Sequence, residues 1–162
     1  TLAGGNPSQL IVSNVGEGTL NLLNGGSATA PLVFIGQSNS GAGNGTVLVS
    51  GSGSQLNASS LLAVGDGSDG ALTVEAGGVV NAPNFRVGAY ASDSPAAGFG
   101  RVQISGSGTE VNVSEQLVIG LERRAEMQVL NGASLNSAQG IIGFASSDSS
   151  TVLVANGGTW ND

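Results

Sequence analysis

The stretch GALTVEAGGVVNAPNFRVG, residues Gly70 to Gly88, shows the pattern on which the fold depends. It starts with a Gly, continues as the alternating run ALTV, and turns at Ala76-Gly77-Gly78. One apolar residue, an Asn, a short polar link and a final apolar segment that ends on Gly follow the turn. Alternation with period two is typical of a β-strand with one buried face, and Gly permits the positive φ of tight turns. The stretch therefore predicts short strands joined by tight turns.

This pattern returns about every 25 to 30 residues along the chain. Its alternating run appears as TLNL (19–22), TVLV (46–49), ALTV (71–74), RVQI (101–104), EMQV (126–129) and TVLV (151–154). The closing Gly of the unit is found at Gly36, Gly65, Gly88, Gly120 and Gly143. Departures occur at Ser13, Ala125 and Ser150, where Gly is expected, and at Gly140, where an apolar residue is expected. The chain is thus built from one repeated unit.

Equivalent positions of the units carry the same chemistry. An apolar column of Ala28, Leu56, Val80, Val111, Leu135 and Trp160 is followed, one residue later, by Thr29, Asn57, Asn81, Asn112, Asn136 and Asn161. An antiparallel sandwich does not require such matching, whereas parallel coils stack equivalent residues about 4.8 Å apart. We therefore predict an all-β parallel β-helix of about six coils with three short strands per coil. The Asn column is expected to form an amide ladder, and Trp160 is expected to pack in the core rather than to stack on a ligand.

The boundaries of the repeat predict how the chain is organised. Leu10 and Val12 fit the third segment of a unit, and Trp160 follows the last turn, so the chain begins and ends in the middle of a unit. We expect residues 1–162 to be a single β-helix fragment, truncated mid-repeat at both ends.

The composition restricts the chemistry. The net charge is −7, and the basic residues are only Arg86, Arg101, Arg123 and Arg124, which argues against nucleic acid as a partner because polyanions need basic surfaces. The chain has no His and no Cys, so imidazole- and thiolate-based nucleophiles and metal sites are excluded. Its 11 acidic residues are scattered, and the calcium-like run Asp66 to Gly70 lacks a complete calcium motif. We predict no catalytic residue, no cofactor and no metal site.

The links between units differ most in length, and the longest runs from Ala89 to Phe99. Insertions of a solenoid project from one face and often carry its binding surface. Tyr90, Asp93 and Phe99 are therefore candidate residues of a partner-contact loop, with a plain spacer as the alternative interpretation.

The units Gly45 to Gly65 and Gly70 to Gly88 resemble the Gly-rich passenger repeats of bacterial autotransporter adhesins, which use type V secretion. The likeness extends from Leu10 to Asp162. It implies a right-handed β-helix at the bacterial cell surface, with no membrane contact by this segment and with a translocator barrel in the outer membrane elsewhere in the full-length protein.

The resemblance further implies an adhesin or stalk segment, associated with virulence. Its expected partner is a host cell-surface or extracellular-matrix protein, or another copy of itself. The alternative hypothesis is a β-helix of tail-spike or lyase type that binds or cleaves polysaccharide. A row of acids on one outer face would favour this alternative, and the sequence does not show one.

Overall fold

The computed structural model describes residues 8–38, 43–89, 98–144 and 149–162. Their regular structure consists entirely of β-strands, which form two sheets. The strands of sheet 1 are β1 (Gln9–Val12), β3 (Ser27–Gln37), β5 (Gln55–Asp66), β7 (Val79–Val87), β9 (Glu110–Ile119), β11 (Ser134–Ser137), β12 (Gly140–Ile142) and β14 (Thr159–Asn161). Those of sheet 2 are β2 (Glu17–Leu23), β4 (Asn44–Ser50), β6 (Asp69–Glu75), β8 (Gly100–Ser105), β10 (Ala125–Leu130) and β13 (Thr151–Ala155).

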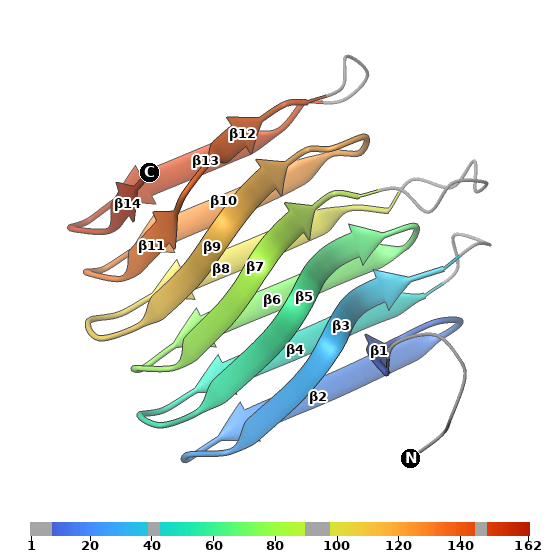
Figure 1. Ribbon diagram of the computed structural model, residues 1–162, viewed down its shortest axis with the longest axis horizontal. Helices are drawn as coiled ribbons and strands as arrows, with labels where there is room; N and C mark the ends of the chain where they lie inside the picture. Colours follow the sequence, from blue (N-terminus) through green and yellow to red (C-terminus); the bar gives the residue numbers. More distant parts are fainter. Residues whose placement is uncertain (1–7, 39–42, 90–97, 145–148) are drawn as a thin grey trace.

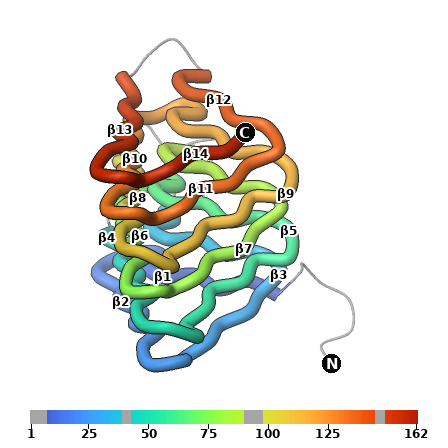
Figure 2. The backbone as a smooth tube through the Cα atoms, turned by 90° about the vertical axis from the view of Figure 1, so that its left-hand side faces the viewer, coloured from blue at the N-terminus to red at the C-terminus, as the bar shows by residue number. Residues whose placement is uncertain are grey.

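The chain is a parallel β-solenoid of about five turns, close to the expected six. Apart from β11 and β12, which both belong to sheet 1, successive strands alternate between the sheets, and strands pair in parallel with the equivalent strand of the next turn. Sheet 1 lies in front in Figure 1 and sheet 2 returns behind it, while the chain climbs from the N-terminal to the C-terminal turns. This sense of winding is right-handed, as parallel crossovers almost always are. Figure 2 shows the same turns stacked in order of sequence.

In the observed register, equivalent positions of the repeat pair with one another and so form columns across the strands. Val47 of β4 pairs with Leu72 of β6, which pairs with Val102 of β8. On sheet 1, Asn57 pairs with Asn81 and Asn81 with Asn112. Equivalent residues of successive units therefore lie side by side, as the parallel interpretation predicts, and the antiparallel sandwich is excluded.

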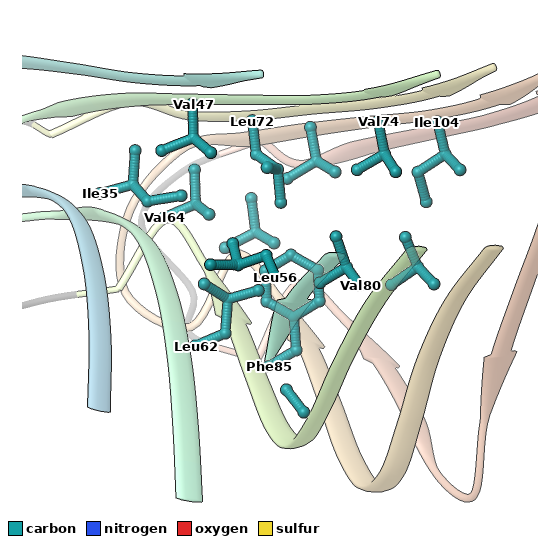
Figure 3. Close-up of a cluster of buried hydrophobic side chains, with 14 of the residues drawn as sticks. Ile35, Val47, Leu56, Leu62, Val64, Leu72, Val74, Val80, Phe85 and Ile104 are labelled. Atoms are coloured by element: carbon teal, nitrogen blue, oxygen red, sulfur yellow. The ribbon is translucent and has the colours of Figure 1, made fainter. Parts of the chain in front are cut away.

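The apolar columns form one core between the two sheets, part of which is drawn in Figure 3. Val47, Val74 and Phe85 are fully inaccessible to solvent. Leu20 and Val152, in the outermost strands of sheet 2, are only partly buried against this core. Val154 pairs with the fully buried Val129 of β10 but is 41% exposed, because β13 is the last strand of sheet 2 and has a neighbouring strand on one side only.

The second and third segments of each unit are continuous in β3, β5, β7 and β9. The ladders between these strands shift register between Ala30 and Leu32, Asn57 and Leu61, and Ala82 and Asn84. Such irregularities bend a strand, so the border between the two segments is a bend rather than a break. In the last turn the same segments are separate strands, β11 and β12.

One narrow edge of the coil, here called the turn edge, connects each sheet 2 strand to the following sheet 1 strand. Its short turns place Asn24, Ala76, Asn131 and Asn156 at φ values of 52 to 56°, each followed by a Gly that also has positive φ. Two consecutive residues of positive φ define a type I′ turn, which favours Asn-Gly. Ala76 adopts this conformation without the polar side chain that makes it tolerable for Asn.

Two buried hydroxyl groups tie the longer turns to the shorter ones beneath them. The Ser54 hydroxyl accepts a hydrogen bond from the Gly25 amide at 3.1 Å and donates to the Ser50 carbonyl at 2.7 Å. The Thr109 hydroxyl does the same for the Gly77 amide and the Ser105 carbonyl, at 3.0 Å in both cases. Because both side chains are inaccessible to solvent, these bonds satisfy polar groups that would otherwise be buried unpaired.

The position of the Trp160 ring explains why residue 140 is a Gly. A Cβ atom at Gly140 would overlap the indole ring of Trp160, which therefore occupies the space that an apolar side chain at position 140 would fill. The ring packs against the core, and its Nε1 donates a hydrogen bond to the Ser137 hydroxyl at 2.8 Å. The expectation that Trp160 is a core residue is confirmed.

At the opposite edge, here called the loop edge, the sheets meet through glycines. A Cβ at Gly70 would collide with the Ile35 carbonyl and with the Gly65 backbone, and one at Gly100 would collide with the Gly88 amide. The opening and closing glycines of the unit therefore allow backbone to approach backbone. Ser13 keeps the closing position with a φ of 69°, like the glycines it replaces, and Ala125 fills the opening position of β10 with a buried methyl group.

Candidate functional site

A groove of about 260 Å³ lies on the outer face of sheet 2, next to the loop edge. It is lined by Asn44, Thr46, Asp69, Gly70, Ala71, Phe99 and Arg101. These residues come from the starts of β4, β6 and β8 and from the residue directly before β8. The groove therefore crosses three adjacent strands.

The repeat register builds this groove. The opening glycines Gly45, Gly70 and Gly100 stack on one another and face inward, so the residues on either side of each Gly face outward. The residues after the Gly form the column Thr46, Ala71 and Arg101. Ala71 is the smallest of the three, and its short side chain leaves a depression between its neighbours. Asn44 pairs with Asp69 in the column before the Gly, and Phe99 comes next in that column.

The backbone of Phe99 is fixed to the turn beneath it. Its amide donates a hydrogen bond to Asp69 Oδ1 at 2.9 Å, and its carbonyl accepts one from the Gly70 amide at 3.0 Å. The same interaction holds the Asp69 carboxylate at the mouth of the groove. Phe99 is half-buried, so the end of the longest link is part of the packed loop edge.

Two guanidinium groups contact the ring of Phe99. The Cζ atoms of Arg101 and Arg124 lie 5.1 and 5.0 Å from the ring centroid, within the range of cation–π attraction. Arg101 also pairs with Glu126 across 3.4 Å, and the two side chains are 60% and 29% exposed. An exposed pair of this kind stabilises the fold little, but together with the ring it restricts where the Arg101 guanidinium points.

The candidate contact residues can be compared with this site. Tyr90 and Asp93 lie outside the described residues. Phe99 is described and belongs to the groove, where it is half-buried beside Arg101 and Arg124. The prediction missed the other groove residues, although one signal was available. The residues that flank the opening Gly, in Asn44-Gly45-Thr46, Asp69-Gly70-Ala71 and Phe99-Gly100-Arg101, occupy the same slots of successive units.

The calcium-like run has other roles. Asp69 is bonded to the Phe99 amide, whereas Asp66 is buried with 7% of its surface exposed. Burial raises the pKa of the Asp66 carboxyl above its ordinary value of 3.8, and the positive charge of Arg86 offsets part of this rise. Within the described ranges, no group of three or more acidic side chains is close enough to hold a metal ion.

The Asn column forms the predicted ladder on sheet 1. Each amide nitrogen donates to the amide oxygen one turn below, from Asn81 to Asn57 at 2.8 Å, from Asn112 to Asn81 at 3.1 Å, and from Asn136 to Asn112 at 2.8 Å. Asn161 continues the ladder to Asn136 at 2.8 Å. Each inner Asn uses its amide nitrogen as a donor to one neighbour and its amide oxygen as an acceptor from the other. The main role of the column is therefore to stabilise the stack of turns.

Comparison with known proteins identifies no relative: no protein-family model, no curated protein and no solved structure matches the chain. In the part of the chain that the structure describes, no helix is long and apolar enough to span a membrane.

Proposed function

We propose that this chain is a rigid stalk segment of a surface-exposed bacterial adhesin, without catalytic activity. The observation that supports the stalk role most directly is the uninterrupted parallel pairing from β2 to β13, over one continuous core. A solenoid of this kind keeps its length and direction because every turn is paired with its neighbours. It can thus hold a binding surface away from the cell.

The non-catalytic part of the proposal is supported by the chemistry of the chain. It has no His or Cys, and the described acidic residues do not gather into a metal-binding group. The charged residues of the groove are engaged in ordinary contacts, Asp69 with a backbone amide and Arg101 with Glu126 and Phe99. This arrangement suits binding better than bond cleavage.

The proposed location and partners follow the resemblance of the repeats to autotransporter passengers. The segment would lie outside the cell, at the bacterial surface, and be anchored at the outer membrane through a region outside this chain. Its partner would be a host cell-surface or matrix protein, or a second copy of the chain.

Adhesion can be tested with the chain coupled to fluorescent beads. Beads should be retained on host epithelial cells, on a matrix-protein coat, or on a surface that carries the chain itself. Beads carrying chain with the core substitution Val74→Asp serve as the control, since they present the same composition without the fold. Equal retention of both kinds of bead, or retention of neither, would contradict the adhesive role.

A further inference from the structure

We propose that the groove on sheet 2 binds an acidic saccharide, that is, a sugar unit that carries a carboxylate group. In this arrangement Arg101 binds the carboxylate, while Asp69, Asn44 and Thr46 bind sugar hydroxyls. The inference goes beyond the stalk role and does not depend on it, because it concerns only the side chains around one groove.

The dimensions of the groove fit a small polar ligand. Ligand pockets of drug-sized molecules typically measure about 300 to 1,000 Å³, and this groove, at about 260 Å³, lies just below that range. Thr46 and Arg101 are two strands apart, which corresponds to about 9.6 Å at the usual strand spacing. Ala71 provides the floor of the depression between them. A single sugar ring can lie across this floor and reach both walls.

The hydrogen-bonding groups of the groove favour a ligand that can both donate and accept hydrogen bonds. The Asp69 carboxylate can only accept, and the Arg101 guanidinium can only donate, whereas Asn44 and Thr46 can do both. Phosphate or sulfate alone would satisfy Arg101 but would be repelled by Asp69. A neutral sugar would satisfy Asp69 but would leave the guanidinium with the Glu126 carboxylate as its anionic partner and add no charge-assisted contact. A sugar acid supplies hydroxyl donors and a carboxylate on the same ring.

The charge distribution also favours an anionic group. The chain has a net charge of −7 and four basic residues, yet Arg101 and Arg124 both contact Phe99 at this groove. The Phe99 ring and Glu126 restrict the Arg101 guanidinium before any ligand arrives, which lowers the ordering cost of binding. Its planar fork suits bidentate contact with a carboxylate. The nearby carboxylates of Asp69 and Glu126 disfavour densely charged polyanions, so one carboxylate per sugar unit fits best.

The proposal can be tested by NMR titration of the isotopically labelled chain with trigalacturonate. The amide signals of residues 69–71 and 99–101 should shift. The methyl ester of the same trisaccharide, which lacks the negative charge, should bind at least about tenfold more weakly, since a charge-assisted hydrogen bond is worth about 1.5 kcal/mol or more. No shift at these residues with trigalacturonate, or equal binding of acid and ester, would overturn the proposal.

Three variants assign the binding to the groove. Arg101→Gln removes the proposed carboxylate contact, and Ala71→Leu fills the floor without changing charge; each should weaken binding about tenfold or more. Arg86→Gln is the matched control, because it removes the same charge from a residue on sheet 1. An equal loss with Arg86→Gln and Arg101→Gln would show non-specific ionic attraction and reject the site. The amide spectrum of each variant without ligand reports whether it is folded.

Discussion

The two narrow edges of the solenoid are built on opposite principles. At the turn edge, every unit reverses direction in one of two kinds of short turn, and the buried hydroxyls of Ser54 and Thr109 tie the longer turns to the shorter ones. At the loop edge, the sheets approach through glycines such as Gly70 and Gly100, and the links between units differ in length. The groove lies at the loop edge, where Phe99 from one link contacts Arg124 from the next.

This contrast shows how a repeat can carry a unique site. The residues that repeat define the stack and its core, while those that vary in the slots beside the opening Gly determine the surface. Asn44, Asp69 and Phe99 occupy equivalent slots and differ in chemistry. Substitutions that act on the core, on each edge and on the ladder can separate these roles.

The largest effect is expected in the core that both edges enclose. Val74 is fully buried, so Val74→Asp places an unpaired carboxylate among aliphatic side chains. We expect a loss of more than about 4 kcal/mol in the free energy of unfolding, measured by urea denaturation followed by circular dichroism. Thr73→Asp, one residue away on the outer face, is the control and should cost less than about 1 kcal/mol. Similar losses for both variants would place Val74 outside the core.

The second prediction concerns the close approach at the loop edge. Gly70→Ala puts a methyl group against the Ile35 carbonyl and the Gly65 backbone, neither of which can move without opening the sheets. We expect it to lower the free energy of unfolding by about 2 to 3 kcal/mol, in the range of overpacked cores. At Ala125, which holds the equivalent slot in β10, the change to Gly should cost only about 1 kcal/mol. If Gly70→Ala is harmless, backbone contact does not shape this edge.

A smaller effect is expected from the Asn ladder. Asn112 donates to Asn81 and accepts from Asn136, so Asn112→Ala removes two hydrogen bonds. We expect a loss of about 1 to 2 kcal/mol in the free energy of unfolding and unchanged bead retention. Gln103→Ala, on the outer face of sheet 2, provides a comparison for the loss of a long polar side chain. Loss of retention without loss of stability would instead make the Asn column a binding row.

A gain in stability is expected at the turn edge. Ala76 has a φ of 52° in a position that Asn occupies in three other turns. Ala76→Asn should therefore raise the free energy of unfolding by about 0.5 to 1 kcal/mol, because Asn tolerates the left-handed region better than Ala. The reverse change, Asn131→Ala, should lower it. A loss of stability in Ala76→Asn would show that backbone strain does not limit this turn.

The weakest effect is a pH dependence at the loop edge. Because burial raises the pKa of Asp66, its contribution to stability is fully present below pH 3.8 and decreases as the pH rises through the folded-state pKa. Asp66→Asn removes this decrease, so the variant should gain stability relative to the parent protein as the pH rises from 3.8 toward neutrality. Urea unfolding at several pH values measures this difference. A constant difference across the range would contradict the assigned burial effect.

The sequence predicted the parts of the structure that repeat. Periodic apolar residues and the Asn column were sufficient to predict the parallel stack, the core position of Trp160 and the ladder, because each depends on equivalent residues lying one strand apart. It did not reveal why Gly140 lacks a side chain, since the compensating ring of Trp160 comes from the following turn.

The groove was harder to predict. The column of Thr46, Ala71 and Arg101 follows from the register and could have been derived from the repeat. The contact of Phe99 with Arg124 could not, because it joins residues of two links whose sequences do not repeat. Repetition determines where strands lie, whereas the conformation of each link is specific to its own sequence.

The most direct test of the stacked repeat uses spin labels on the outer face of sheet 2, which is straightforward because the chain has no Cys. The register places Asn21 four strands from Gln128 and five from Leu153, through Leu48, Thr73 and Gln103. Spin labels on cysteine pairs at 21 and 128, and at 21 and 153, should give electron-resonance distance distributions that correspond to backbone separations of about 19 and 24 Å. The second distance should exceed the first by about 5 Å, which is one strand spacing. Distances that do not increase by one strand spacing from the first pair to the second would contradict the parallel, in-register solenoid.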